Sequence, residues 1–301
     1  NSVQNRDAFA QAAWEFDAGL TATAGLRTSH VRFRSEDHFI ALPGNPDDSG
    51  AARYSALTPV AGLMFRQNPM LHWYAAYGTG FRPNSGLDVA NNPFAAETSE
   101  SYEAGLRFTS FDNAITATLA AYWMKKDNIL TSDPINGGFS IAAGAARSQG
   151  IEADISANLP GDVQILATYA YTDAAWTSSS LDFNFGLSIL PGDPLINIPK
   201  HTANLVVSKD IDLGNSGSVT IGGGLNYVGR RLGETASNFY LPSYTLARLF
   251  VLGEALDLDD AQRALPLADL DALGLVTGAG QVRAAVDVRP YGEHDTDWYV
   301  V

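Results

Sequence analysis

The side chains that most often carry out chemistry in proteins are few and scattered along this chain. Five histidines occur, and none is four residues from another, the spacing that puts two histidines on one helix face for a metal ion. No Ser–His–acid arrangement, phosphate-binding loop or dinucleotide-binding fingerprint is present. His201 lies in a Pro-Lys-His-Thr stretch, where a structural role at a strand edge is favoured over metal binding. The sequence therefore predicts no catalytic residues, no bound metal and no cofactor.

Two acidic segments resemble calcium-binding loops only in part. Residues 47–50 are Asp-Asp-Ser-Gly, and Asp257, Asp259 and Asp260 lie close together further along the chain. A helix–loop–helix calcium site also needs a central glycine and a terminal glutamate, which the second segment lacks. Acidic side chains at loop tips are usually just hydrated, and we expect this of both segments.

The composition excludes several classes of protein. Nucleic-acid binding needs a basic surface, whereas the net charge here is −14. The absence of cysteine excludes thiolate metal sites and disulfide scaffolds, and it suits a chain that crosses an oxidising periplasm. Charged residues make up 17%, which is low for a soluble surface, yet no segment approaches the ~20 apolar residues of a membrane-spanning helix. Residues 1–6 are polar, so we expect a removed leader or a chain that begins within a longer protein.

Two segments joined by a short turn show the dominant pattern of the sequence. Residues 151–159 alternate between apolar positions, from Ile151 to Leu159, and polar positions, from Glu152 to Asn158. The alternation resumes at residue 163, after a Pro-Gly-Asp break. A period of two residues predicts a β-strand, and Pro-Gly-Asp predicts a turn. Residues 150–172 are therefore a predicted β-hairpin with one apolar and one polar face.

The same hairpin recurs along the chain and gives eleven predicted strands. They pair as 8–16 with 20–33, 54–65 with 71–81, 102–108 with 114–124, 150–159 with 163–172 and 202–208 with 218–228, and 244–250 follows alone. The connections within pairs are only a few residues long, whereas those between pairs run to roughly 12 to 27 residues, above the usual loop length. Aromatic residues such as Trp123, Tyr169 and Tyr227 gather near strand ends. Together these features are typical of an antiparallel transmembrane β-barrel with short periplasmic turns, long extracellular loops and aromatic girdles.

A soluble β-sandwich binding module is the alternative that shares the alternation, with its apolar face turned inward. Sandwich strands average about 5–6 residues, whereas several predicted strands here reach the ~9–11 residues that cross a bilayer on a tilt. A sandwich also has no reason to sort its loops into two sizes. The pattern favours the membrane barrel.

Six short stretches resemble the barrel of TonB-dependent outer-membrane receptors, in particular the siderophore-receptor branch. They follow the order that the family has, and together they cover roughly residues 9–250. The stretches are 77–83 (YGTGFRP), 97–107 (ETSESYEAGLR), 146–152 (ARSQGIE), 167–174 (ATYAYTDA), 198–205 (IPKHTANL) and 224–231 (GLNYVGRR).

That resemblance implies an all-β, 22-stranded barrel in the outer membrane of a Gram-negative bacterium, closed by an N-terminal plug domain. It implies uptake of ferric siderophores, driven by the TonB energy-transducing complex through the plug. It also implies contact with outer-membrane lipid and with the barrel-assembly machinery. The sequence shows no plug and no TonB box, so we expect a fragment with about eleven of the family's strands. A passive outer-membrane porin, which needs no plug, is the alternative.

The resemblance puts ligand recognition in the long loops and at the barrel mouth. Arg82 could attract an anionic metal chelate, where the alternative is a structural role in its Gly-Phe-Arg-Pro stretch. Three aromatic residues could stack on catecholate or hydroxamate groups, or else pack within loops and girdles; they are Trp176, Phe183 and Phe185. Four charged residues of the polar strand faces are expected to face the lumen; they are Glu103, Arg107, Glu152 and Asp154.

The pattern changes after residue 250 and divides the chain into two predicted parts, a partial barrel over 1–250 and an atypical tail over 251–301. The tail is rich in Ala, Leu, Asp and Val, lacks sustained alternation and ends without the terminal aromatic residue of the family. We interpret it as out of frame or disordered, following a reading-frame change near Phe250. A genuine appended domain is the competing explanation, and translation of the coding DNA in its other frames distinguishes the two.

Overall fold

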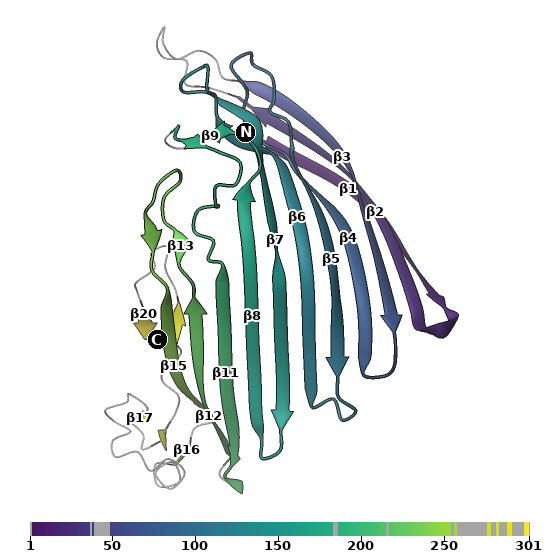
Figure 1. The fold of residues 1–301 in the computed structure, drawn as a ribbon, viewed down its shortest axis with the longest axis vertical. Helices are drawn as coiled ribbons and strands as arrows, with labels where there is room; N and C mark the ends of the chain where they lie inside the picture. The colour runs from purple at the N-terminus through teal and green to yellow at the C-terminus, as the bar shows by residue number, and fades with distance from the viewer. Residues whose placement is uncertain are drawn as a thin grey trace.

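Most of the described residues form a curved antiparallel sheet of long strands (Figure 1). A computed structural model describes residues 2–36, 38, 49–182, 186–214 and 217–253, together with a few short strands beyond residue 255. Regular structure in these ranges is β, apart from short 3-10 turns such as Asp17–Gly19. No helix among these residues is both long enough and apolar enough to cross a membrane.

All eleven predicted strands are confirmed. Their bounds are β1 (Ser2–Phe16), β2 (Leu20–Ser35), β3 (Gly50–Arg66), β4 (Leu71–Arg82), β5 (Glu97–Thr109), β6 (Ile115–Ser132), β7 (Ser140–Leu159), β8 (Val163–Trp176), β11 (His201–Asp212), β12 (Ser218–Val228) and β15 (Tyr244–Gly253). Most of them run beyond the predicted ends, toward the edge of the sheet that carries the long loops. The sequence underestimates these strands because apolar alternation ends there while the backbone pairing continues.

Strands that follow one another in the sequence are neighbours in the sheet, in the order β1-β2-β3-β4-β5-β6-β7-β8-β11-β12-β15. Two short strands, β9 (Ser180–Leu181) and β10 (Ser188–Ile189), join the sheet beside the end of β6. A two-stranded ribbon of β13 (Arg231–Leu232) and β14 (Tyr240–Leu241) lies in the loop between β12 and β15. Within the described ranges, β1 and β15 each pair on one side only, so the sheet has two open edges.

The hairpin count left the last long strand without a partner, but in the structure it has one. β15 pairs antiparallel with β12 and continues to Gly253, which lies opposite Val219. Most of the predicted tail lies outside the described residues, and the boundary at residue 250 stays a prediction. The parts of it that are described are β16 (Leu256–Asp257), β17 (Val276–Thr277), β18 (Gln281–Val282), β19 (Val288–Pro290) and β20 (Trp298–Val300).

Strand register fixes which side chains share a face, because directly opposed residues project to the same side of a sheet. One row across the sheet consists of Trp14, Ala22, Leu63, Ala75, Ala104, Ala121, Ile151 and Tyr171. The next row consists of Phe16, Leu20, Phe65, Trp73, Leu106, Leu119, Ala153, Tyr169, Ala203 and Tyr227. We call this side of the sheet the apolar face and the opposite side the polar face.

The apolar face is uncovered in the described part of the chain. Trp73, Tyr102 and Ile151 remain 45%, 48% and 48% exposed. Contiguous apolar patches beyond a few hundred Å² are rare on soluble monomers, whereas a transmembrane barrel presents such a band to lipid. A β-sandwich would cover this face with a second sheet, and the residues described supply none. An uncovered apolar face of this extent favours the membrane barrel over the sandwich alternative.

Short turns close the hairpins at the edge that we call the lower edge, after its place in Figure 1. β7 and β8 are joined by Pro160, Gly161 and Asp162, as predicted, and Gly161 takes the left-handed φ of 84° that glycine adopts without strain. In the β5–β6 turn the Ser110 hydroxyl donates to the Asp112 carboxylate at 2.5 Å. That hydrogen bond holds the pKa of the Asp112 carboxyl below its usual range.

At the opposite, upper edge, Tyr54 anchors the connection between β4 and β5. Its ring is buried and packs edge-on against Phe33, with ring centroids 6.0 Å apart. The Tyr54 hydroxyl lies 2.7 Å from the carbonyl oxygen of Asn84 and 2.9 Å from that of Phe94. Both ends of the 83–96 loop are therefore fixed against β3.

Gly150 is required by close packing between β6, β7 and β8. A Cβ atom there would lie 2.0 Å from the Tyr171 carbonyl oxygen and 3.0 Å from the Tyr122 ring. We expect Gly150→Ala to destabilise the sheet by about 1–3 kcal/mol, because backbone must shift to admit the methyl group. Unfolding of the complete gene product by urea in detergent micelles measures the effect. Gly62→Ala is the matched control, since its Cβ would meet nothing closer than 3.8 Å; equal stability of the two variants would contradict the packing argument.

Candidate functional site

The polar face carries the four charged residues that the sequence singled out for a lumen. Arg107 and Asp154 share one row, since each lies opposite Thr118 on β6. Glu103 and Glu152 lie on the same face, and Glu103 accepts a 2.7 Å hydrogen bond from the Tyr74 hydroxyl. All four side chains are exposed. This face is thus charged and accessible to water through the middle of the sheet.

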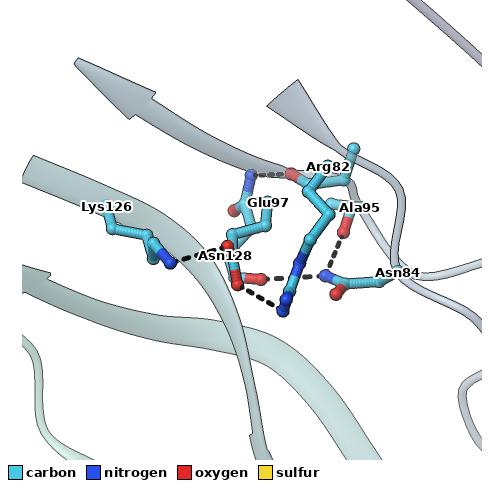
Figure 2. A network of polar contacts seen from close by, with 7 residues as sticks. Arg82, Asn84, Ala95, Glu97, Lys126 and Asn128 are labelled. Carbon is cyan, nitrogen blue, oxygen red and sulfur yellow. Dashed lines mark hydrogen bonds and ion pairs between the residues drawn. The ribbon is translucent and has the colours of Figure 1, made fainter. Parts of the chain in front are cut away.

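A compact polar cluster lies on the same face at the upper edge, where β4 ends, β5 begins and β6 passes beside them (Figure 2). We call it the Glu97 cluster; its members are Arg82, Asn84, Glu97, Lys126 and Asn128. Glu97 is ion-paired on both sides, with Arg82 Nη2 at 3.0 Å and Lys126 Nζ at 2.9 Å. Its side chain is only 8% exposed, against 71% for Arg82 and 42% for Lys126.

The two asparagines of the cluster tie the 83–96 loop to β6. Asn84 is 4% exposed, and its amide nitrogen donates to the carbonyl oxygens of Ala95 at 2.8 Å and Asn128 at 3.0 Å. Asn128 in turn donates to the carbonyl oxygen of Ala96 at 2.9 Å. Asn128 has a left-handed φ of 59° beside an irregularity in the β6–β7 register, a conformation that asparagine tolerates better than most residues.

The charge balance of the cluster leaves one positive charge in excess, from two cations and one carboxylate. Glu97 is desolvated and must be paired, which accounts for one of the two cations. The guanidinium of Arg82 is largely open to solvent and keeps donors free for a second anion, to which it can bind bidentately. This arrangement can hold an anionic ligand.

The structure describes one of the three aromatic residues that were predicted to contact a ligand. Trp176 is the last residue of β8, opposite Ala146, in the same polar-face row as Lys126. Arg82 and Trp176 are therefore on one face at one edge, four strands apart, or about 20 Å at the usual strand spacing. Phe183 and Phe185 lie outside the described residues.

The acidic and histidine candidates do not form a metal site in the part of the chain that the structure describes. No group of three or more ligating side chains occurs there. His201 is at the start of β11, where its Nδ1 lies 2.8 Å from the Tyr169 hydroxyl. Asp47 and Asp48 lie outside the described residues.

Two loop carboxylates at the upper edge order the neighbouring backbone. The Asp88 carboxylate accepts hydrogen bonds from the backbone of Asn92 at 2.8 Å and Ala90 at 2.9 Å. Asp133 accepts from the Asn136 side chain at 2.8 Å and from the Ile135 backbone at 2.8 Å. These bonds stabilise the ionised carboxylates and hold the pKa of both groups below the usual range.

Sequence reasoning missed Glu97, Lys126, Asn84 and Asn128 as site residues. A signal for Glu97 existed, because it continues the polar alternation of Ser99, Ser101 and Glu103 along β5. The partner of Glu97 on β6 could not be found that way, because it depends on the register of two strands that the sequence does not fix.

The buried carboxylate of Glu97 is expected to hold the loop between β4 and β5. Glu97→Gln removes the negative charge and leaves Arg82 and Lys126 facing each other, so we expect amides of the 83–96 loop to exchange hydrogen about tenfold faster. Hydrogen–deuterium exchange of the complete gene product measures this. Asp127→Asn is the control, because its 2.9 Å pair with Lys125 is exposed on both sides and should have little effect. Unchanged exchange in Glu97→Gln would show that the loop does not depend on the ion pairs.

Comparison with known proteins gives the family. A family model described as TonB dependent receptor-like, beta-barrel matches residues 1–261. The metal-pseudopaline receptor CntO of Pseudomonas aeruginosa strain UCBPP-PA14 is 35% identical over 204 residues, which cover 67% of this chain and 28% of that protein. The ferrichrome outer membrane transporter/phage receptor of Escherichia coli K12 is 31% identical over 178 residues, or 59% of this chain and 23% of that protein.

Solved structures show the same fold. The siderophore receptor PiuA from Acinetobacter baumannii superposes with a TM-score of 0.71 at 19% identity, covering 84% of this chain and 37% of that one. The ferric preacinetobactin receptor BauA from the same species gives a TM-score of 0.67 at 20% identity, covering 86% and 37%. The chain thus spans well under half of each of these four relatives.

The expected resemblance is confirmed, and the matching family is one of transport receptors, so the porin alternative has no support in it. The antiparallel sheet is a partial barrel, and its location is the outer membrane of a Gram-negative bacterium. This chain belongs to the TonB-dependent receptor family and forms part of its β-barrel.

Proposed function

We propose that this chain is part of an outer-membrane receptor that binds ferric siderophores and imports them with energy from the TonB complex. The observation that carries the proposal is the match of residues 1–261 to the receptor barrel. Names of relatives support the cargo class, since they include receptors for ferrichrome, ferrioxamine B and metal-pseudopaline.

The two faces of the sheet give the proposal its geometry. The apolar face would meet lipid, and the polar face would line a water-filled lumen with Glu103, Arg107, Glu152 and Asp154. The short turns would then be periplasmic and the long loops extracellular. The Glu97 cluster and Trp176 would stand at the external mouth, where a ligand arrives.

Capture of a chelate at the mouth needs no bond chemistry. Catecholate chelates of iron are anionic, and the exposed guanidinium of Arg82 offers charge and paired donors to such a ligand. An indole such as that of Trp176 can stack on the flat rings of catecholates. Selectivity would come from charge and shape, which is the work of a receptor and not of an enzyme.

A working barrel requires further strands beside β1 and β15. Unpaired backbone N–H and C=O groups cost several kcal/mol each in hydrocarbon, so both open edges must be paired for the sheet to stay in lipid. The family supplies these strands, the plug and the TonB contact in other parts of its receptors. Partners of the complete gene product would therefore include the TonB complex, the barrel-assembly machinery and outer-membrane lipid.

A second cargo is favoured by one specific observation. Two relatives at 35% and 36% identity are named metal-pseudopaline receptors, a name that does not restrict the metal to iron. The cargo would then be another chelated metal ion, recognised by the chelator. Binding of zinc, nickel and ferric chelates side by side distinguishes this cargo from ferric siderophores.

Binding of ferric chelates to the purified complete gene product tests the proposal. We expect Arg82→Gln to weaken the affinity for an anionic ferric catecholate about tenfold or more, because a charge-assisted hydrogen bond is lost. A neutral ferric hydroxamate should bind equally to both proteins, which separates the loss of charge from a loss of loop structure. Intrinsic tryptophan fluorescence reports the binding.

Arg66→Gln is the matched control, because Arg66 is exposed on the polar face at the lower edge, where β3 ends, whereas Arg82 lies at the upper edge. It removes the same charge far from the mouth and should leave the affinity unchanged. Equal affinities of the Arg82 and Arg66 variants would exclude Arg82 from binding. Failure of the complete gene product to bind any metal chelate would contradict the proposed function itself.

A further inference from the structure

Four basic side chains gather at the upper edge of the apolar face, on the first three strands. They are Arg6 on β1, His30 and Arg32 on β2, and Arg53 on β3, and we call them the basic patch. Register brings them together, because Arg6 lies opposite His30 and Arg32 lies opposite Arg53. All four side chains are exposed, and a groove of about 260 Å³ runs among them.

The basic patch begins where the apolar side chains end. Toward the lower edge, the next positions on this face include Ala8 on β1 and Leu57 on β3, with Leu26 further down β2. Leu57 is 63% exposed and Leu26 is 45% exposed. In a barrel that spans a membrane, such a change marks the border between hydrocarbon and headgroups. The upper edge carries the long loops, so this border belongs to the outer leaflet.

Acidic side chains do not neutralise the basic patch in the described part of the chain. Elsewhere at this border, basic residues have acidic partners on the same face, as in the ion pairs of Lys125 with Asp127 and of Arg147 with Asp173. Within the described ranges, Arg6, Arg32 and Arg53 form no ion pair. These uncompensated cations stand out in a chain whose net charge is −14.

The same face is hollowed below the basic patch. A groove of about 790 Å³ crosses the sheet from Trp14 on β1 to Trp123 on β6. Small side chains such as Ala24, Ala61 and Ala75 line it. A depression of this kind accommodates hydrocarbon chains more closely than a row of bulky side chains does. The positive charge of the basic patch and the apolar groove below it match the anionic headgroup and the hydrocarbon chains of an amphipathic lipid.

We propose that the basic patch binds the phosphate groups of lipids in the outer leaflet. Guanidinium groups match phosphate oxygens bidentately, and three of them converge here at headgroup depth. Free anions would contact the arginines alone, whereas a phosphorylated lipid also covers the apolar surface beneath them. The contact fixes the height and tilt of β1, β2 and β3 in the membrane. It requires only a membrane-spanning sheet and is independent of the siderophore proposal.

Lipid A with two phosphate groups is the probe, and dephosphorylated lipid A is the ligand control. The complete gene product, purified in detergent, is compared with the triple variant Arg6→Gln/Arg32→Gln/Arg53→Gln by native mass spectrometry. We expect the parent to prefer the phosphorylated lipid. We expect the triple variant to lose affinity for that lipid on the order of 100-fold, because each basic residue near anionic headgroups contributes about fivefold and the three factors multiply. The control variant Arg27→Gln/Arg66→Gln/Lys209→Gln removes as much charge from the polar face and the lower edge, and it should bind like the parent.

Three results would overturn the proposal. The parent could bind phosphorylated and dephosphorylated lipid A equally, which would show that the phosphate groups are not recognised. The triple variant could bind like the parent, or inorganic phosphate at equal concentration could displace the lipid, which would indicate a site for free anions. Heat-dependent gel mobility checks the folding of each protein. If the triple variant fails to fold, the three single variants should each lose affinity about fivefold.

Discussion

Pairing of every backbone N–H and C=O group between neighbouring strands is the constraint on which the rest of this structure depends. In hydrocarbon no water replaces a missing partner, so a spanning sheet must pair its strands along their whole length. The eleven strands here follow one another in an unbroken antiparallel order. Most pairs continue past the point where apolar alternation stops, whereas β3 and β4 pair only over Val60–Arg66 and His72–Gly78. The same constraint requires partner strands at the open edges of β1 and β15, which is why the chain is understood as part of a larger barrel.

Continuous register also creates the functional surfaces. Because opposed residues share a face, alternation in each strand adds up to one apolar surface and one polar surface across the sheet. The Glu97 cluster arises where β4 ends and β5 begins beside β6, so that residues from the three strands meet around one buried carboxylate. The basic patch arises in the same way on the opposite face of β1, β2 and β3. Neither group is a sequence motif.

Much of the fold could be predicted from the sequence because its physics is local. Strict alternation around Ile151 and the Pro-Gly-Asp turn at 160–162 specify a hairpin without reference to the rest of the chain. Arg82 and Trp176 were found from their types, and the register puts them on one face. Glu97 and Lys126 were missed because their contact joins residues 29 apart through the register of two strands. Strand ends were missed for a related reason: at the upper edge the alternation between apolar and polar residues is lost, as in the Ile-Ala-Ala-Gly-Ala-Ala run at 141–146 of β7, although the backbone pairing continues.

The central claim is that the apolar face meets lipid while the polar face lines water. The chain contains no cysteine. Single cysteines placed along β7 are therefore unique labels in the complete gene product once any cysteine outside this chain is replaced by serine. A water-soluble thiol reagent applied to outer membranes should react rapidly with Glu152→Cys and Asp154→Cys, and slowly with Ile151→Cys and Ala153→Cys. A lipid-soluble reagent should give the reverse order. Equal reactivity at all four positions would contradict the account.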